Sequence, residues 1–196
     1  MSETDAGQNV SYSFRPSLIG GTWSFSLGED DLYWDSGRQT GRISYDDIRR
    51  VRLSYQPRSL QRHRFLTELR CEGGPKVSIL STSWKSISEL ERLDRPYHDF
   101  VVALHQRLGA RGRAIEFIGG INPVKFWVAL VLFVPLVAGI IGVAVRAYQQ
   151  DAYVAALLIV AFLALFLVQG VNYFRRNRPV RYRPDAVPQE LLPKAG

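Results

Sequence analysis

Two long stretches without a charged side chain constrain this chain more than any other feature of its sequence. Phe126 to Val145 contains 20 residues and Ala152 to Phe174 contains 23. An α-helix rises 1.5 Å per residue, so about 20 apolar residues cross the ~30 Å hydrocarbon core of a bilayer. The alternative is a pair of buried helices in a soluble bundle, but such helices normally carry a polar stripe, and both segments are apolar all round. The sequence therefore predicts transmembrane helices over residues 123–146 and 152–174.

Charges beside these segments predict their orientation. The link between them is Arg146 to Asp151, six residues with one basic side chain, so the two helices must be antiparallel neighbours. The outer flanks are strongly basic and contain Arg107, Arg111, Arg113, Lys125, Arg175, Arg176, Arg178, Arg181 and Arg183. By the positive-inside rule both termini are cytoplasmic, which predicts a two-span protein of the cytoplasmic (inner) membrane.

The residues inside the predicted hairpin favour an anchor or a packing element over a pore. Ala138 and Gly142 are four apart and form a small-xxx-small pair that would let the second helix approach closely. Gln169 and Asn172 are polar, near the cytoplasmic end of the second segment. A conducting protein would want ionisable groups at the midplane, and the two segments contain none.

The residues before the hairpin predict a separate β-rich domain. Alternation with period two, broken by turn residues, predicts successive antiparallel strands. The expected strands are Trp23–Leu27, Asp31–Asp35, Arg38–Ser44, Ile48–Tyr55, Arg64–Glu72 and Lys76–Thr82. The period then changes: Asp94, expected to cap the helix, is followed by apolar residues at helical spacing that Gly109 ends. The expected fold class is α+β, an open barrel or sandwich plugged by one C-terminal helix, plus the all-α hairpin.

The remaining segments are expected to be less regular. Residues 1–16 are predicted to be a flexible N-terminus, 17–110 the β domain, and 111–122 a glycine-rich connector whose apolar residues could lie at the membrane interface. Residues 83–93 carry no clear period and leave a short helical insertion open. The tail, residues 175–196, contains four prolines and is expected to be extended or disordered. Its apolar residues would also allow it to pack on the soluble domain or on a partner.

Part of the β domain resembles a known family. The residues concerned are Trp23-Ser24-Phe25-Ser26-Leu27, Asp31-Leu32-Tyr33-Trp34, Ile43-Ser44-Tyr45-Asp46-Asp47-Ile48 and the following Arg49-Arg50-Val51. Together they resemble the opening and the Ile-x-Tyr-x-x-Ile segment of bacterial pleckstrin-homology-like domains. The resemblance covers roughly residues 17 to 109. It implies a pleckstrin-homology-like fold beside membrane segments, and it supplies no catalytic residue.

Residue patterns that carry catalysis or metal binding are not found. His63, His98 and His105 are scattered without ligand spacing, and boundary or solvent-facing histidines are the simpler interpretation. No phosphate-binding glycine loop occurs, and Cys71 has no nearby base in the sequence. We therefore expect neither an enzyme nor a cofactor or metal site.

The basic charge is concentrated near the predicted membrane. The net charge is +7, of which residues 1–121 contribute 17 basic minus 15 acidic, or +2, and residues 175–196 contribute 6 minus 2, or +4. This distribution favours a membrane surface over nucleic acid as the partner. The candidate headgroup contacts are Arg49, Arg50, Arg52, Arg58, Arg62 and Arg64 in the domain, and Arg175, Arg176 and Arg178 in the tail.

Two interpretations of the domain arginines stay open. They could hold anionic lipid headgroups, each contributing about 1 kcal/mol. They could instead form a solvated strand face paired with Asp46, Asp47 and Glu68, which is the commoner situation for charge runs.

Three functions follow from these features. The leading one is a membrane-anchored scaffold or accessory protein whose domain binds a membrane or cytoplasmic protein at the cytoplasmic face. The second is a tethered sensor of anionic lipid, and the third is an accessory subunit of a transporter or envelope enzyme that packs through its hairpin.

Overall fold

The computed structural model describes residues 10–57, 63–74, 76–86, 89–112 and 114–193, which form two compact units. One unit contains residues 1–119 together with 180–196, and the other contains residues 120–179. The second unit is therefore an insertion into the first. Each unit is described below by itself.

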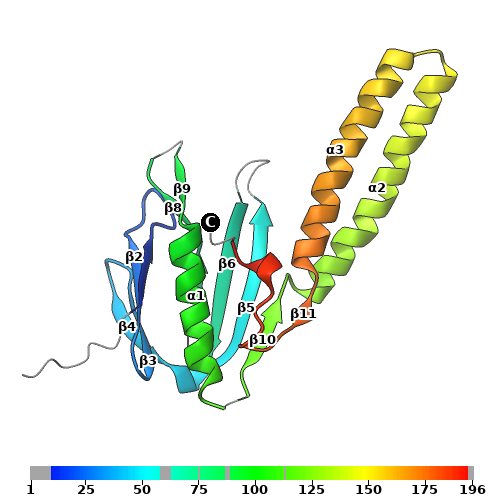
Figure 1. Cartoon of the computed structure of the whole chain (residues 1–196). Helices are drawn as coiled ribbons and strands as arrows, with labels where there is room; N and C mark the ends of the chain where they lie inside the picture. The colour runs from blue at the N-terminus through cyan, green and yellow to red at the C-terminus, as the bar shows by residue number, and fades with distance from the viewer. Residues whose placement is uncertain (1–9, 58–62, 75, 87–88, 113, 194–196) are drawn as a thin grey trace, which may run out of the picture. The chain divides into compact units, whose positions relative to one another are not determined.

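The first unit contains a four-stranded antiparallel sheet. Its strands are β1 (Ser11–Phe14), β2 (Trp23–Leu27), β3 (Asp31–Asp35) and β4 (Thr40–Ser44), in that order (Figure 1). Alternate residues enter the core, as the period-two pattern predicted: Phe25, Leu27 and Leu32 are fully buried, whereas their strand neighbours face outward. The first strand lies in the stretch predicted to be flexible, and Tyr12 and Phe14 bury its inner face.

A second sheet has the order β11-β10-β5-β6-β7. Its strands are β5 (Ile48–Pro57), β6 (His63–Cys71), β7 (Lys76–Leu80), β10 (Glu116–Gly119) and β11 (Val180–Arg181). A 3₁₀ turn, η1 (Tyr45–Asp47), leads from β4 into β5. Strand β10 runs parallel to β5, and β11 is antiparallel to β10. The predicted strands over residues 48–72 are confirmed to within two residues at each end.

The predicted strand Lys76–Thr82 is divided at Ser81. Ser81 is fully buried: its N–H donates to Phe65 O (3.0 Å), and its Oγ accepts from Phe65 N (2.8 Å). The chain then turns into a separate hairpin of β8 (Thr82–Trp84) and β9 (Leu90–Arg92), in the region where a helical insertion had been left open.

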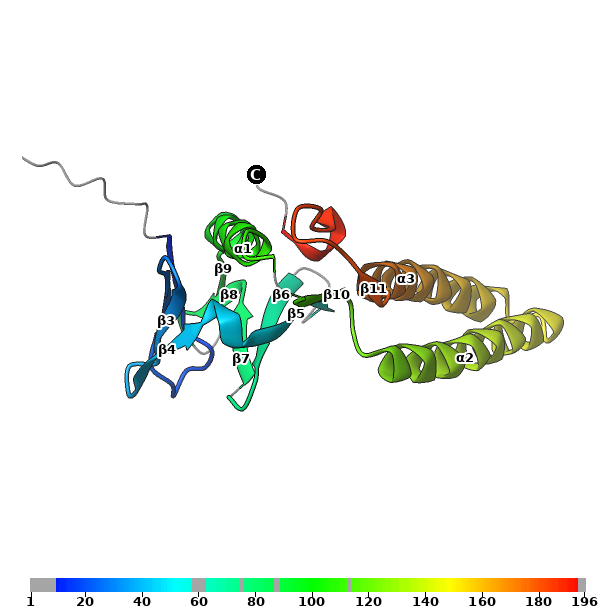
Figure 2. The ribbon, with the colours of Figure 1, turned by 90° about the horizontal axis from the view of Figure 1, so that it is seen from below.

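Helix α1 (Asp94–Gly109) lies across the open side between the two sheets (Figures 1 and 2). Its buried face includes Tyr97, Phe100 and Leu104, each completely buried. The Phe100 ring lies 5.6 Å from Tyr12 in β1, centroid to centroid. The predicted helix is confirmed, but Leu93 rather than Asp94 is the N-cap, and Asp94 pairs with Arg92 as the first helical residue.

The C-terminal tail belongs to the first unit. After β11 the chain forms a short 3₁₀ helix, η2 (Gln189–Leu191), and buries Leu191 and Leu192 in the core. Gly119 in β10 has no side chain where Leu191 packs, and a Cβ there would clash with it. The expectation of a disordered tail is therefore wrong for residues 180–193, because the burial of Leu191 and Leu192 compensates the entropy of ordering it. The connector prediction also changes, since Phe117 in β10 is a core residue.

A buried histidine joins the tail to the helix. His105 is fully buried, its Nδ1 lies 2.7 Å from Val101 O, and its Nε2 lies 2.9 Å from Tyr182 Oη. A carbonyl oxygen only accepts, so Nδ1 carries the proton and Tyr182 donates to Nε2 of a neutral ring. Burial lowers the pKa of His105 to about 4. Phe117 contacts both rings, at 5.3 Å from His105 and 5.8 Å from Tyr182.

The second unit is an antiparallel pair of helices, α2 (Pro123–Gln149) and α3 (Tyr153–Asn177). Their most apolar windows have mean hydropathies of 2.9 and 2.7 and are 6% buried, so both helices are long and apolar enough to cross a membrane. Asn122 caps α2 by accepting from Val124 N (2.9 Å), with proline at the first helical position. Helix α2 extends beyond its charge-free segment by about one turn at each end, and α3 extends by about one turn at its C-terminal end only.

The discontinuous first unit leads to a prediction about its stability. Gly119 and Val180 are register partners in the β10–β11 pair, so an Asn-Gly hairpin turn can replace residues 120–179. We expect this joined unit to unfold cooperatively in urea, and residues 1–119 alone to be less stable by about 3–6 kcal/mol, the value of burying two leucines. Equal unfolding midpoints for the two proteins would show that the tail is not part of the core.

The second prediction concerns pH and uses the same joined unit. A histidine whose pKa is lowered in the folded state favours folding above its unfolded pKa, 6.5, and this contribution is lost as pH falls from 6.5 toward 4. The shift corresponds to a loss of about 3 kcal/mol across that window. We expect His105→Gln to reduce the pH dependence of the free energy of unfolding, measured in urea. His98→Gln, which replaces a half-buried ring, should retain this pH dependence. Identical pH profiles for both variants would contradict this.

Candidate functional site

The outer face of the four-stranded sheet is the candidate site. On this face the register places Ser26, Tyr33 and Arg42 in one row across β2, β3 and β4. Ser24, Asp35 and Thr40 form the next row. These side chains point away from the core because Phe25, Leu32 and Ile43 take the inner positions of the same strands.

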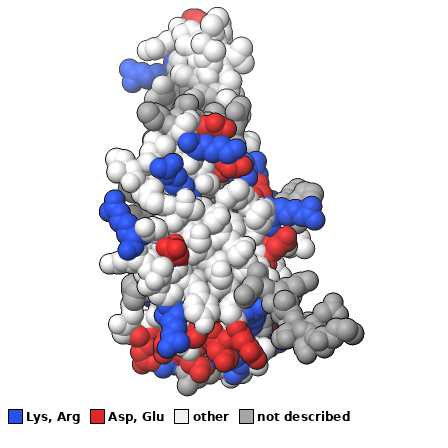
Figure 3. Space-filling model, turned by 90° about the vertical axis from the view of Figure 1, so that its left-hand side faces the viewer, with Lys and Arg blue, Asp and Glu red and all other residues white. Residues whose placement is uncertain are grey.

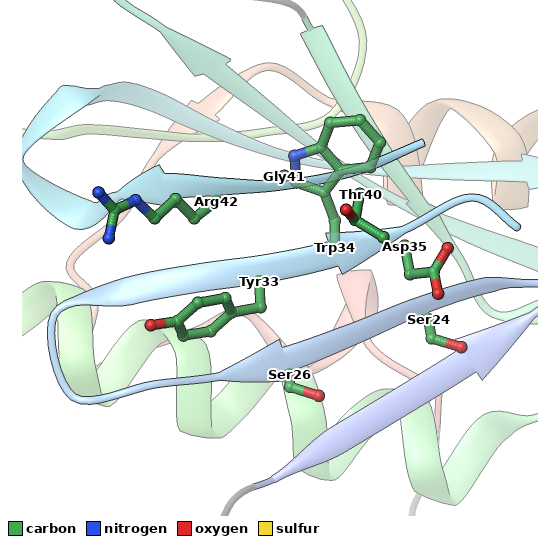
Figure 4. Close-up of a pocket in the computed structure, with 8 residues that line it drawn as sticks. All are labelled: Ser24, Ser26, Tyr33, Trp34, Asp35, Thr40, Gly41 and Arg42. Carbon is green, nitrogen blue, oxygen red and sulfur yellow. The ribbon is translucent and has the colours of Figure 1, made fainter. Parts of the chain in front are cut away.

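The two rows line a shallow hollow of about 530 Å³, completed by Trp34 and Gly41 (Figure 4). The Trp34 ring lies against Gly41, where a Cβ would come within 2.8 Å of it, so glycine gives the ring its place across β4. Trp34 also stacks on Trp23, with centroids 5.9 Å apart and an interplanar angle of 17°. Trp34 alternates with Tyr33 and Asp35 along β3, so its ring lies on the opposite side of the sheet, packed with Trp23 against the core.

Tyr33 and Arg42 are the groups available for recognition. Tyr33 is 48% exposed, and its ring packs over Gly28, where a Cβ would come within 2.7 Å of it. Neither Tyr33 nor Arg42 makes a hydrogen bond or ion pair within the described part of the chain. Asp35, by contrast, accepts from Gly37 N (2.7 Å) and holds the β3–β4 turn, where Gly37 has a φ of +75°.

This surface is suited to binding. It offers hydroxyl groups, one phenol, one guanidinium and one carboxylate engaged in a turn, without a paired base and nucleophile. Within the described residues, no group of three or more His, Cys, Asp or Glu side chains lies close enough to hold a metal ion. Burial raises the pKa of the Cys71 thiol, which makes its reactive thiolate less available.

Charge is scattered on this side of the first unit. Figure 3 shows Lys and Arg side chains scattered over a largely uncharged surface, with the largest group of Asp and Glu at one end and other acidic side chains dispersed between. Arg111 joins two acidic segments, pairing with Asp30 of the β2–β3 turn and lying 3.9 Å from Asp46 of η1. It also lies over the Tyr45 ring at 5.2 Å. The hydrogen bond to Asp30 raises the pKa of Arg111.

The structure divides the predicted arginine cluster among several ion pairs. Arg49 pairs with Glu72, and Arg50 with Glu116 at 2.6 Å. Glu116 also holds Arg181 of the tail at 3.2 Å. Arg52 is the register partner of Glu68, which pairs with Lys76, and Arg64 is half-buried in β6. Arg58 and Arg62 lie outside the described residues.

The acidic partners of Arg49 and Arg50 differ from the expected ones, whereas Glu68 lies opposite Arg52. Glu72 and Glu116 hold Arg49 and Arg50, whereas the predicted Asp46 lies beside Arg111. The strand alternation indicated which arginines face solvent, but β10, which contributes Glu116, had no strand signal in the sequence.

The tail arginines form the end of α3. Arg175 and Arg176 occupy its last turn and Arg178 is its C-cap residue. Cations stabilise a helix C-terminus, where carbonyl oxygens carry partial negative charge. The structure thus gives these arginines a local role in ending the helix.

The predicted helix-packing pair does not face α3. Ala138 and Gly142 are both exposed, and a Cβ at Gly142 would meet only open space. The helices instead meet through aromatic rings: Phe133 lies 5.1 Å from Phe166, and Gly170 leaves room for the Phe133 ring. The prediction was wrong because ring size, rather than small residues on α2, decides which faces meet.

Comparison of the chain with protein-family models, with curated proteins and with solved structures gave no match.

Proposed function

We propose that this chain is a membrane-anchored scaffold or accessory protein whose β domain holds a protein partner on the outer face of the four-stranded sheet. The observation that carries the proposal is the hollow around the exposed side chains of Tyr33 and Arg42 on the outer face of the sheet. Tyrosine, tryptophan and arginine are the residues that most often dominate the energetics of protein interfaces. A binding role is proposed here, in preference to an enzymatic one.

The charge distribution favours a protein over anionic lipid as the partner of this domain. A lipid-binding surface needs several unpaired cations close together. Arg49 and Arg50 are instead neutralised by Glu72 and Glu116, and the surface in Figure 3 has only scattered positive charge. The tethered lipid sensor is therefore the less supported alternative.

We also propose that the β domain belongs to the pleckstrin-homology-like class. The order of elements supports this: a four-stranded antiparallel sheet, then the antiparallel strands β5, β6 and β7, then a helix covering the open side between the sheets. Strands β10 and β11 are additions that extend the second sheet beyond β5.

Two spans with both termini in the cytoplasm complete the proposal. Strand β10 precedes α2 and β11 follows α3, yet the two strands pair within one unit. Paired strands must lie on the same side of a membrane, so the two helices between them would cross it twice. The nine basic residues of the outer flanks favour the cytoplasm as that side.

Partner capture tests the binding surface. The full chain is purified in mild detergent from the membranes of its native cells, and co-purifying proteins are identified by mass spectrometry. We expect Tyr33→Ala combined with Arg42→Glu to reduce the captured partner at least about tenfold, because losing two central anchors costs more than 1.4 kcal/mol. Arg70→Glu, an exposed arginine on β6 of the other sheet, is the charge-matched control.

A partner retained equally by the double variant and the control would refute this site. The lipid alternative would be favoured by two results together. No protein partner is captured, and the full chain binds anionic vesicles only while Arg175, Arg176 and Arg178 keep their charges.

Reporter fusions test the orientation. A reporter that is active only in the cytoplasm should be active after Gly196 and inactive when inserted after Gln150, in the turn between α2 and α3. The reverse pattern would overturn the orientation, and activity at both positions would overturn the two spans.

A further inference from the structure

Two amide side chains on the outer side of α3 have no partner in the second unit. Gln169 and Asn172 are exposed, and neither makes a hydrogen bond within the described residues. The face of α3 that packs on α2 is a different one, containing Ala156, Leu163 and Gly170. The amides lie about 100° or more around the helix from that face, at 100° per residue.

Their depth makes this exposure costly in a bilayer. Gln169 lies six residues before Arg175, the first charged residue after the apolar segment, which is about 9 Å along the helix axis. A glutamine side chain is too short to reach the headgroups over that distance. Polar groups left without hydrogen bonds in hydrocarbon are strongly disfavoured, so Gln169 requires a partner within the membrane, and Asn172 lies three residues nearer to Arg175 on the same side of the helix.

The amides belong to a regular seam. Leu158, Phe162, Leu165, Gln169 and Asn172 are separated by alternating steps of four and three residues, the spacing of a helix–helix interface. The three apolar members are 66%, 59% and 68% exposed. The seam is thus a continuous stripe that α2 leaves uncovered, with polar residues at one end.

We propose that this seam pairs with the same seam of a second copy of the chain. An amide both donates and accepts, so two glutamines or two asparagines satisfy one another. All copies insert in the same direction, and a twofold axis normal to the membrane then places Gln169 beside Gln169 and Asn172 beside Asn172 at equal depth. Polar residues at such positions select register and partner in helix pairs. The inference rests on the proposed membrane spans.

Disulfide crosslinking of the full chain tests the seam directly. In a Cys71→Ser background reconstituted into phosphatidylcholine vesicles, oxidation should convert Leu165→Cys to a covalent dimer. Val160→Cys is the control, because Val160 is similarly exposed, at 51%, but lies about 140° around the helix. Equal crosslinking of both variants, or none with Leu165→Cys, overturns the proposal.

Energy transfer between copies labelled at the C-terminus tests the amides. Adding lipid dilutes the chain in the bilayer and dissociates the dimer. We expect the Gln169→Leu and Asn172→Leu double variant to dissociate at about tenfold less added lipid than the natural chain, since interhelical amide hydrogen bonds raise the dimerisation constant roughly tenfold. Val171→Leu, on another side of α3, should behave as the natural chain does. Unchanged transfer in the double variant overturns the proposal.

Extraction with alkaline carbonate separates this inference from the proposed function. A chain that stays in the membrane but remains monomeric overturns the seam alone, and the amides then bind lipid or another protein. A chain that is extracted overturns both the spans and the pairing.

Discussion

Two short strands, four and two residues long, hold the first unit of this protein together. Strand β10 lies parallel to β5, and β11, which follows α3, pairs with β10. The pairing brings Tyr182 to the buried ring of His105 and Leu191 to Gly119. A core that is built from both ends of the chain becomes complete only when the segment after α3 has been made and has returned.

This arrangement couples the two apolar helices to the domain through the polypeptide itself. Only Gly120 to Asn122 separate β10 from α2, and only Arg178 and Pro179 separate α3 from β11. A hairpin inserted into a domain differs from a simple tether, because both of its ends continue into hydrogen-bonded strands. Without β10 and β11, strand β5 would be an open edge of its sheet. The chain covers this edge with its own strands.

The proposed binding surface and the proposed pairing surface lie in different units and use different physics. In water, the sheet face offers aromatic and charged groups around a preformed hollow, where little conformational entropy remains to be lost on binding. In hydrocarbon, apolar contact alone does not distinguish a helix from lipid, and in the proposed pairing the amides of α3 would provide the specificity. A dimer would present two such sheet faces together, which increases the effective concentration for a partner that engages both.

The sequence by itself determined the local elements. Period-two alternation placed the strands from Trp23 to Asp35, helical spacing placed α1, and segment length placed α2 and α3, because each of these signals arises from neighbouring residues and one buried face. The tertiary structure alone decided the partners. Strand β10 pairs residues as distant as Glu116 and Arg50, the Phe133 ring rather than Ala138 and Gly142 selects the helix interface, and the proline-rich tail becomes part of a core. These pairings depend on contacts between residues that are far apart in the sequence. The sequence of a short segment does not show which surface will bury it.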